Sequence, residues 1–209
     1  GSRCDRYDSI IGQASQATFF DERERLIFRE YREGSGGGPS VGIPRALLVY
    51  DYAPLLIGFL NGLGVRVVLS RQTTKEIVEQ AVELSYADSC FPLKLLHGHV
   101  AALSDADFIL YPCVIRLGKK DGDENQKYAC PLIQASPYII RQALGLEERL
   151  LIPVIDFSRG HAEVINSLAG VAEKLGFGRK QGRKAAILGL KAQQQFDIDR
   201  VALGRRLLR

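Results

Sequence analysis

The sequence predicts an α/β fold of the Rossmann-like type, in which a mainly parallel sheet has helices on both faces. After residue 40, short apolar runs alternate with segments of helical periodicity, which is typical of βαβ units. With 209 residues, of which 46% are hydrophobic, the chain can bury one ordinary core. We expect a helical leader with a glycine-rich linker (1–40), the α/β domain (41–178), and a basic helical extension toward a further domain (179–209).

Four short apolar runs are the candidate strands, at 46–50, 65–70, 108–112 and 150–155. The leader is expected to contain a helix near 20–33, where charged and apolar residues share the segment. Residues 34–40, with the sequence GSGGGPS, predict a flexible joint. Because this joint precedes a strand instead of linking a strand to a helix, we do not interpret it as a phosphate-binding loop.

Capping residues mark the expected helices. Pro54 suits the first turn of a helix that stops at Gly62 or Gly64, and Thr73 with Glu76 forms a capping box for a helix reaching about residue 85. Further helices are expected to begin at Asp88 or Ser89 with Pro92 in the first turn, at Ser136-Pro137, at Ser158, and in the basic tail from Lys180.

The net charge of +4 is unevenly distributed along the chain. From Lys174 onward there are ten basic and two acidic residues, which gives this tail +8 and leaves −4 on the remainder. The body therefore offers no broad phosphate-binding surface, and aromatic residues are not interleaved with the basic ones, so we expect no nucleic-acid partner. No apolar run is long enough to span a membrane. The lack of any methionine suggests a piece cut from a longer protein.

Three cysteines, each within two residues of a proline, lie in the middle of the chain: Cys90, Cys113 and Cys130. They indicate a metal or cluster site, because thiolates are the preferred ligands of iron–sulfur clusters and a neighbouring proline stiffens the loop. Cys4 is a possible fourth ligand. The spacing is no familiar metal signature, since 22 and 16 residues separate the three and no Cys-x-x-Cys occurs.

The alternative interpretation is that these cysteines are small buried hydrophobic residues without a chemical role. Disulfides are less consistent with a chain that can form a core without them. The expected elements favour the cluster: Cys90 lies at a helix N-terminus, Cys113 at the carboxyl end of a strand, and Cys130 on the long loop that follows. Open α/β sheets bind their ligands at the carboxyl ends of the strands.

Several polar residues are further candidates for a role in the site or in the fold. His97 and His99 are two apart on one helix and point to different faces, so we expect one of them near the cysteines and the other in a structural role. Arg116 begins a polar loop that is either solvated or in contact with an anion. Arg45, at the start of the first expected strand, should lie at the opposite end of the sheet. No dinucleotide fingerprint, P-loop or nucleophile elbow is present.

Three ordered motifs resemble one family. They are residues 42–48 (GIPRALL), residues 87–94 (ADSCFPLK) continuing into 97–100 (HGHV), and residues 128–132 (YACPL). Over about residues 41–155 the chain resembles the CoA-substrate-specific enzyme activase family. In such proteins this domain is similar to the iron–sulfur D-component of 2-hydroxyglutaryl-CoA dehydratase and accompanies an ATP-dependent activator.

The resemblance implies a [4Fe-4S] cluster that handles single electrons in the reducing cytoplasm of an anaerobe. Cys90 and Cys130 match the activase-type motifs, whereas Cys113 is similar to a dehydratase-subunit cysteine that follows a strand. Lys94 and His97 would tune the potential of the cluster. The implied partners are an activator ATPase domain and dehydratase-like domains, on the same or another chain, and the piece alone is not expected to be catalytic.

Two other functions remain open at this point. The domain could be a non-redox module that binds a small molecule such as an acyl-CoA, with the cysteines merely packed. It could also hold a structural zinc ion. The isolated piece could, in addition, lack its cluster.

Overall fold

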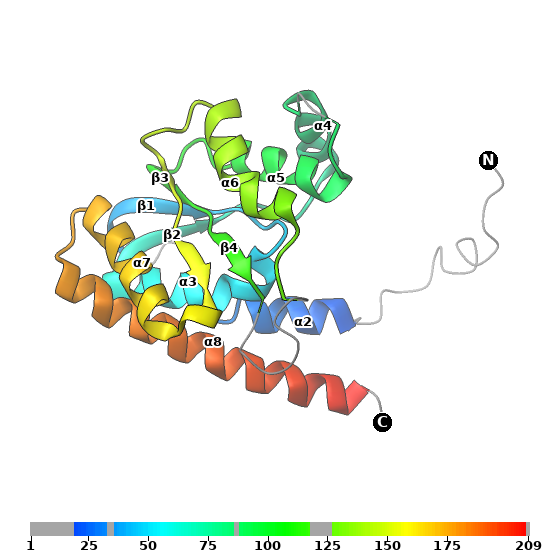
Figure 1. Cartoon of the computed structure of the whole chain (residues 1–209). Coiled ribbons are helices and arrows are strands. Elements are labelled where there is room, and N and C mark those ends of the chain that lie inside the picture. The colour runs from blue at the N-terminus through cyan, green and yellow to red at the C-terminus, as the bar shows by residue number, and fades with distance from the viewer. Residues whose placement is uncertain (1–18, 33–35, 86–87, 118–126, 208–209) are drawn as a thin grey trace.

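The computed structural model of this chain describes residues 19–32, 36–85, 88–117 and 127–207. Its main sheet has four parallel strands in the order β2-β1-β3-β5, with helices on both faces (Figure 1). The strands are β1 (Gly37–Ile43), β2 (Val65–Leu69), β3 (Phe108–Leu110) and β5 (Leu150–Leu151). The predicted Rossmann-like α/β fold is therefore confirmed.

Strands β3 and β5 each continue into a second short strand. These are β4 (Cys113–Arg116) and β6 (Val154–Asp156), which pair in parallel as a separate two-stranded sheet. The backbone N–H groups of Tyr111 and Cys113 still donate to the carbonyls of Leu151 and Pro153, at 3.1 and 2.9 Å. Pro153 has no N–H to donate in return, which removes one bond of the ladder and divides each strand in two.

The first strand differs from the prediction. Residues 46–50 were expected as a strand, but they form a turn and the start of helix α3 (Val49–Leu63), while the strand is Gly37–Ile43. A continuous apolar run fits a buried helix as well as a buried strand. Here α3 is covered on two sides, by the sheet and by α8 (Arg179–Leu207), so nearly its whole surface is apolar.

The expected glycine-rich joint also contributes to the sheet, because residues 37–40 belong to β1. Gly36, just before the strand, has φ +101°, and a Cβ atom there would lie 2.3 Å from the carbonyl oxygen of Val65. Only glycine allows the chain to enter the sheet beside β2 in this conformation.

Two groups of helices cover the sheet. Helices α3, α7 (His161–Lys174) and α8 lie on one face, and α4 (Lys75–Glu83), α5 (Phe91–Ala101) and α6 (Pro131–Ala143) on the other (Figure 1). The 3-10 turn η2 (Phe157–Arg159) joins β6 to α7, and α2 (Phe19–Ile27) packs on α3 and α8. Helix α6 was expected to open at Ser136-Pro137, but it begins at Pro131, five residues before Ser136.

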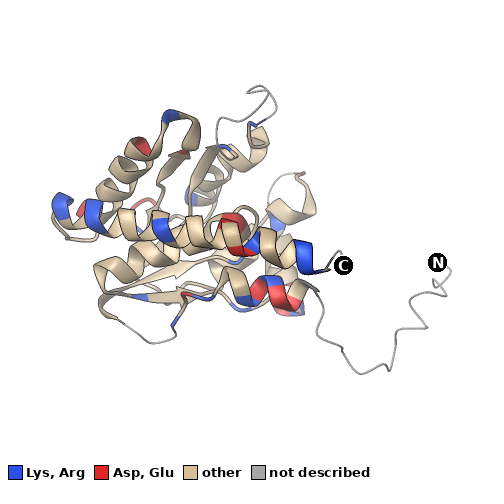
Figure 2. Cartoon of the chain, turned by 90° about the horizontal axis from the view of Figure 1, so that it is seen from below, with Lys and Arg blue, Asp and Glu red and all other residues tan. Residues whose placement is uncertain are grey.

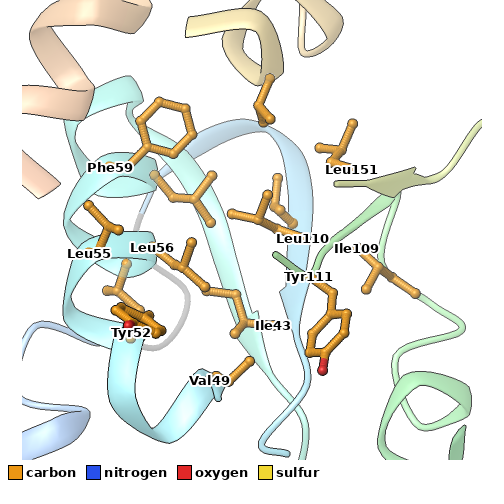
Figure 3. Packing of buried hydrophobic residues seen from close by; sticks show 14 of the residues in the cluster. Ile43, Val49, Tyr52, Leu55, Leu56, Phe59, Ile109, Leu110, Tyr111 and Leu151 are labelled. Carbon is orange, nitrogen blue, oxygen red and sulfur yellow. The ribbon is translucent and has the colours of Figure 1, made fainter. Parts of the chain in front are cut away.

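The core lies between α3 and the sheet. Leu56 of α3 points toward the strands, where Ile43 and Leu110 are likewise completely buried (Figure 3). Burying an aliphatic or aromatic side chain of this size stabilises the fold by about 1.5–3 kcal/mol. The core is therefore set by the contact of α3 with the central strands β1 and β3.

The predicted basic helix exists and forms an outer layer on α3 and α7. Basic residues are spread along α8, while acidic ones gather on the neighbouring α2 (Figure 2). Arg29, just after α2, pairs with Asp199 of α8 at 2.6 Å, and Arg206 pairs with Glu22. Within the described residues, no helix combines the length and the apolar character that crossing a membrane requires.

Candidate functional site

All strands of the main sheet end at the same edge, which we call the carboxyl edge. Helix α5 leads into β3 and α6 leads into β5, so both helices run back against the strand direction. Their N-termini therefore lie on the side of the carboxyl edge, where open α/β sheets bind ligands. The two helices also contact each other.

Cys90 lies at the N-terminus of α5, as predicted, but it is itself the N-cap residue, a position that was expected at Asp88 or Ser89. Its backbone is extended (φ −62°, ψ 147°), and its carbonyl accepts the first helical hydrogen bonds from Leu93 and Lys94, at 3.0 and 3.2 Å. Pro92 occupies the first turn, where a missing N–H costs nothing. The Cys90 side chain is exposed and makes no capping bond, so its sulfur is accessible to a ligand or a partner.

Cys130 occupies the equivalent position on α6. It was expected on a loop, but it is the N-cap residue of the helix, with Pro131 in the first turn and its carbonyl bonded to the Gln134 N–H at 3.0 Å. The Gln134 side chain also donates to the carbonyl of Ala129 at 2.7 Å. These bonds hold the residues around Cys130 in place while the cysteine itself remains exposed.

Cys113 is in a different environment. It begins β4, past the end of β3, and only 3% of it is exposed. Its thiol donates to the carbonyl oxygen of Gln134 at 3.3 Å. Burial raises the pKa of the Cys113 thiol, and a hydrogen bond with Tyr138 only partly offsets this. Cys113 is therefore a buried, protonated thiol behind the first turn of α6.

The three cysteines share one side of the sheet without forming a closed ligand set. In the parts of the chain that the structure describes, no group of three or more His, Cys, Asp or Glu side chains is close enough to hold a metal ion. Cys4 lies outside the described residues. What the structure presents is a pair of exposed thiols at two helix N-termini, with a third thiol buried nearby.

Neither predicted tuning residue is exposed beside a sulfur. Lys94 is half-buried in the first turn of α5, and His97 is buried with its Nδ1 atom 3.2 Å from the Leu93 carbonyl. Because a carbonyl only accepts, Nδ1 carries the proton. His99 is buried as well, so neither histidine of the pair is open to solvent.

A comparison with protein families matches residues 40–209 to one family, described as a CoA enzyme activase uncharacterised domain (DUF2229). The match covers the chain from β1 to the end of α8. This chain belongs to that family. The match extends well beyond residues 41–155, over which the motif resemblance was expected, and includes α7 and α8. Comparisons with curated proteins and with solved structures gave no match.

The activase domain also has a polar cluster at this edge, formed by Arg45, Ser70 and His99, that the sequence did not predict. Arg45 follows β1 after a single residue, Pro44, so it lies at the carboxyl edge and the expectation of the opposite end was wrong. Its backbone N–H donates to the Ser70 hydroxyl at 2.8 Å, and its guanidinium pairs with Glu24 at 3.3 Å. Pro44, which cannot continue a central strand, was the signal that the strand ends there.

Ser70 links this cluster to α5. Its Oγ atom is 2.9 Å from His99 Nδ1, and the Thr73 hydroxyl is 3.1 Å from His99 Nε2. Burial lowers the pKa of His99 to about 4, and the nearby charge of Arg45 contributes in the same direction. The neutral ring thus connects α5 to the segment that follows β2 by two hydrogen bonds.

A cavity of about 490 Å³ lies past the ends of β4 and β6. Arg116, predicted on a polar loop, is in fact the last residue of β4 and lines this cavity together with Tyr128. The accompanying Lys119 and Lys120 fall outside the described residues. Sequence reasoning missed the cavity because it is formed by segments far apart in the chain.

Proposed function

We propose that this activase domain binds an iron–sulfur cluster and transfers electrons in an ATP-driven system that activates CoA-substrate enzymes of the 2-hydroxyacyl-CoA dehydratase type. The observation that supports this most is the matched position of Cys90 and Cys130. Each begins a helix on the carboxyl edge, each is exposed, and the two helices are neighbours. Two accessible thiols on one edge would supply two of the four ligands that such a cluster takes.

The residues present fit a cluster in part. Cys90 and Cys130 are accessible as ligands without a change of the fold. Cys113 would become a third ligand only if its thiol left the Gln134 carbonyl and its buried surroundings. The remaining ligand would come from Cys4 or from a partner. A bound [4Fe-4S] cluster would supply one-electron transfer.

The surrounding residues would orient and tune such a centre. The free N–H groups in the first turns of α5 and α6 lie next to the two cysteines and favour negative charge. Lys94, in the first turn of α5, adds a positive charge on the same side, and the Leu93 carbonyl fixes the proton of His97 on Nδ1. The helix N–H groups and the Lys94 charge would both raise the reduction potential relative to an apolar site, because they stabilise the more negative reduced form.

The same proposal includes the partners and the compartment. An exposed centre exchanges electrons with a protein that docks on this edge, which in this system is the activator ATPase domain or a dehydratase-like domain. Such a centre persists in a reducing, oxygen-free cytoplasm. The domain itself would be an electron carrier and not a complete catalyst.

The test is anaerobic reconstitution of the chain with iron and sulfide, followed by assays of iron, acid-labile sulfide and visible absorption that bleaches with dithionite. We expect stoichiometric iron in the unaltered chain, and loss of the absorption in Cys90→Ser and in Cys130→Ser. Lys75→Ala serves as a surface control, because Lys75 is exposed on α4.

A reconstituted chain without iron or sulfide would refute the proposal for this chain. Zinc bound with sulfur coordination in place of iron would select a structural zinc site instead. If Cys113→Ser removes the centre as fully as Cys90→Ser does, the buried thiol is the third ligand.

A further inference from the structure

The cavity past β4 and β6 is a second candidate binding site, separate from the cysteine pair. Its volume of about 490 Å³ lies in the range of roughly 300–1,000 Å³ that is common for small-molecule sites. β4, β6, η2 and α7 all contribute to its wall, as does the segment before α6. It is therefore formed by the tertiary fold and not by one loop.

One wall of the cavity is aromatic. The Arg116 guanidinium lies 4.5 Å from the centre of the Tyr128 ring and donates to the Tyr128 hydroxyl. This contact holds the guanidinium against the ring, and 48% of Tyr128 is exposed. A flat side chain held in this way offers a stacking surface to a planar ligand.

The cavity also contains charges of both signs. Arg159 lines it from the end of η2 and, among the described residues, forms no hydrogen bond or ion pair. Glu163, in the first turn of α7, likewise has no partner within the described part of the chain. The Asp156 carboxylate, by contrast, accepts bonds from the Ser158 N–H and hydroxyl, at 3.0 and 2.6 Å.

An amide completes the lining. Asn166 of α7 accepts a bond from Arg183 at its Oδ1 atom, at 2.9 Å, so its NH2 group is the part that remains for a ligand. The cavity therefore combines a stacking surface, two guanidinium groups, an amide donor and an uncommitted carboxylate. A ligand that matches all of these has a planar ring, an anionic group and an N–H donor.

We propose that this cavity binds a nucleoside monophosphate whose base carries an exocyclic amine. The phosphate is held by Arg116 and Arg159, since guanidinium groups match phosphate oxygens in geometry and charge. The base stacks on Tyr128, and its amine donates to Glu163. This site does not depend on the proposed cluster.

The test is isothermal titration of the full chain with AMP, IMP, adenosine and inorganic phosphate. AMP and IMP are a matched pair, because IMP has a carbonyl where AMP has its exocyclic amine. We expect saturable binding of AMP, with weaker binding of the other three. Arg159→Ala should weaken AMP binding about tenfold, the loss typical for one charge-assisted contact.

Two further variants make the test specific. Glu163→Gln should remove the preference for AMP over IMP, because an amide can both accept from an amine and donate to a carbonyl. Arg71→Ala is the control, since Arg71 is an exposed arginine that does not line the cavity. The same titrations on a Cys90→Ser/Cys130→Ser chain should give the same AMP affinity, because the cavity does not depend on the two cysteines. AMP binding can therefore be tested independently of the proposed cluster.

Absence of saturable AMP binding would overturn the proposal. So would phosphate binding as tightly as AMP, because the ring would then contribute nothing, or an equal loss in Arg71→Ala and Arg159→Ala. Arg159 and Glu163 are both exposed, so we expect Arg159→Ala and Glu163→Gln to unfold at the same temperature as the unaltered chain. This measurement shows that a loss of AMP binding does not come from a loss of folding.

Discussion

The buried thiol of Cys113 donates a hydrogen bond to the Gln134 carbonyl oxygen, 3.3 Å away, within the first turn of the helix that Cys130 begins. The Gln134 N–H in turn donates to the Cys130 carbonyl at 3.0 Å. One residue thus connects an exposed cysteine and a buried one. Release of the Cys113 thiol would leave the Gln134 carbonyl without this donor, at the start of the helix where Cys130 lies.

The three cysteines should differ strongly in reactivity. Cys90 and Cys130 are exposed and should react rapidly with iodoacetamide in the metal-free chain, whereas Cys113 is buried and its pKa is raised by burial. Because the thiolate is the reactive form, alkylation of Cys113 should be slow at pH 7 and accelerate at alkaline pH. Peptide mass spectrometry over time measures each rate. Equal rates for the three residues would contradict the buried position of Cys113.

Stability should fall in mild acid because of His99. The unfolded chain protonates this ring near its ordinary pKa of 6.5, but the folded chain protonates it only near pH 4. Between these values the unfolded state binds more protons, so the free energy of unfolding decreases as the pH falls. Urea unfolding at pH 7, 6 and 5 should show a shallower decrease for His99→Gln than for the unaltered chain. Parallel decreases in the two proteins would argue against this role of His99.

Close packing of α3 and α8 should make Gly189 sensitive to substitution. A Cβ atom at this position would lie 2.4 Å from the Leu55 carbonyl oxygen, whereas at Gly204 on the same helix nothing lies within 4 Å. We expect Gly189→Ala to destabilise the fold by about 1–3 kcal/mol, as overpacking does. Gly204→Ala should be neutral or stabilise it by up to about 1 kcal/mol, because alanine favours the helix. Thermal unfolding of both variants provides the measurement.

Helix α2 should detach locally when its buried contact is removed. Ile27 is 1% exposed and packs into the core, whereas Phe20 on the same helix is 71% exposed. Truncating a buried isoleucine to alanine costs about 2–5 kcal/mol, which is enough to open a peripheral helix. Hydrogen exchange in residues 19–27 should therefore accelerate in Ile27→Ala and stay unchanged in Phe20→Ala. Equal protection in the two variants would show that α2 is held mainly by its ion pairs.

Much of the helical layer was predictable from local signals. The helix predicted from the capping box at Thr73 is α4, although its N-cap is Thr74, one residue later, whose hydroxyl accepts from the Ile77 N–H. Pro92 marks the start of α5. The strand at 37–43 was missed because Gly37, Pro39 and Gly42 are typical of loops, and only its central place between β2 and β3 makes this segment a strand.

The cysteines likewise show which features local signals predict and which depend on contacts between distant segments. Cys90 was placed correctly at a helix N-terminus, because that position depends on Pro92, which follows it closely in the chain. The helix position of Cys130 was missed, although Pro131 suits a first helical turn, since Ser136-Pro137 offered a second start signal close by. Burial of Cys113 depends on α6 folding over β4, and no nearby residue reports that contact.

The amino-acid order alone therefore determined the α/β class, the approximate starts of α4, α5 and α8, the charge of the tail and the three motifs that resemble the activase family. Each of these features depends on residues close together in the chain. The tertiary structure decided which run forms the central strand, that Arg45 lies at the same edge as the cysteines, and that Cys113 is enclosed. These features depend on contacts between segments far apart in sequence, whose free energy of burial exceeds the local preferences.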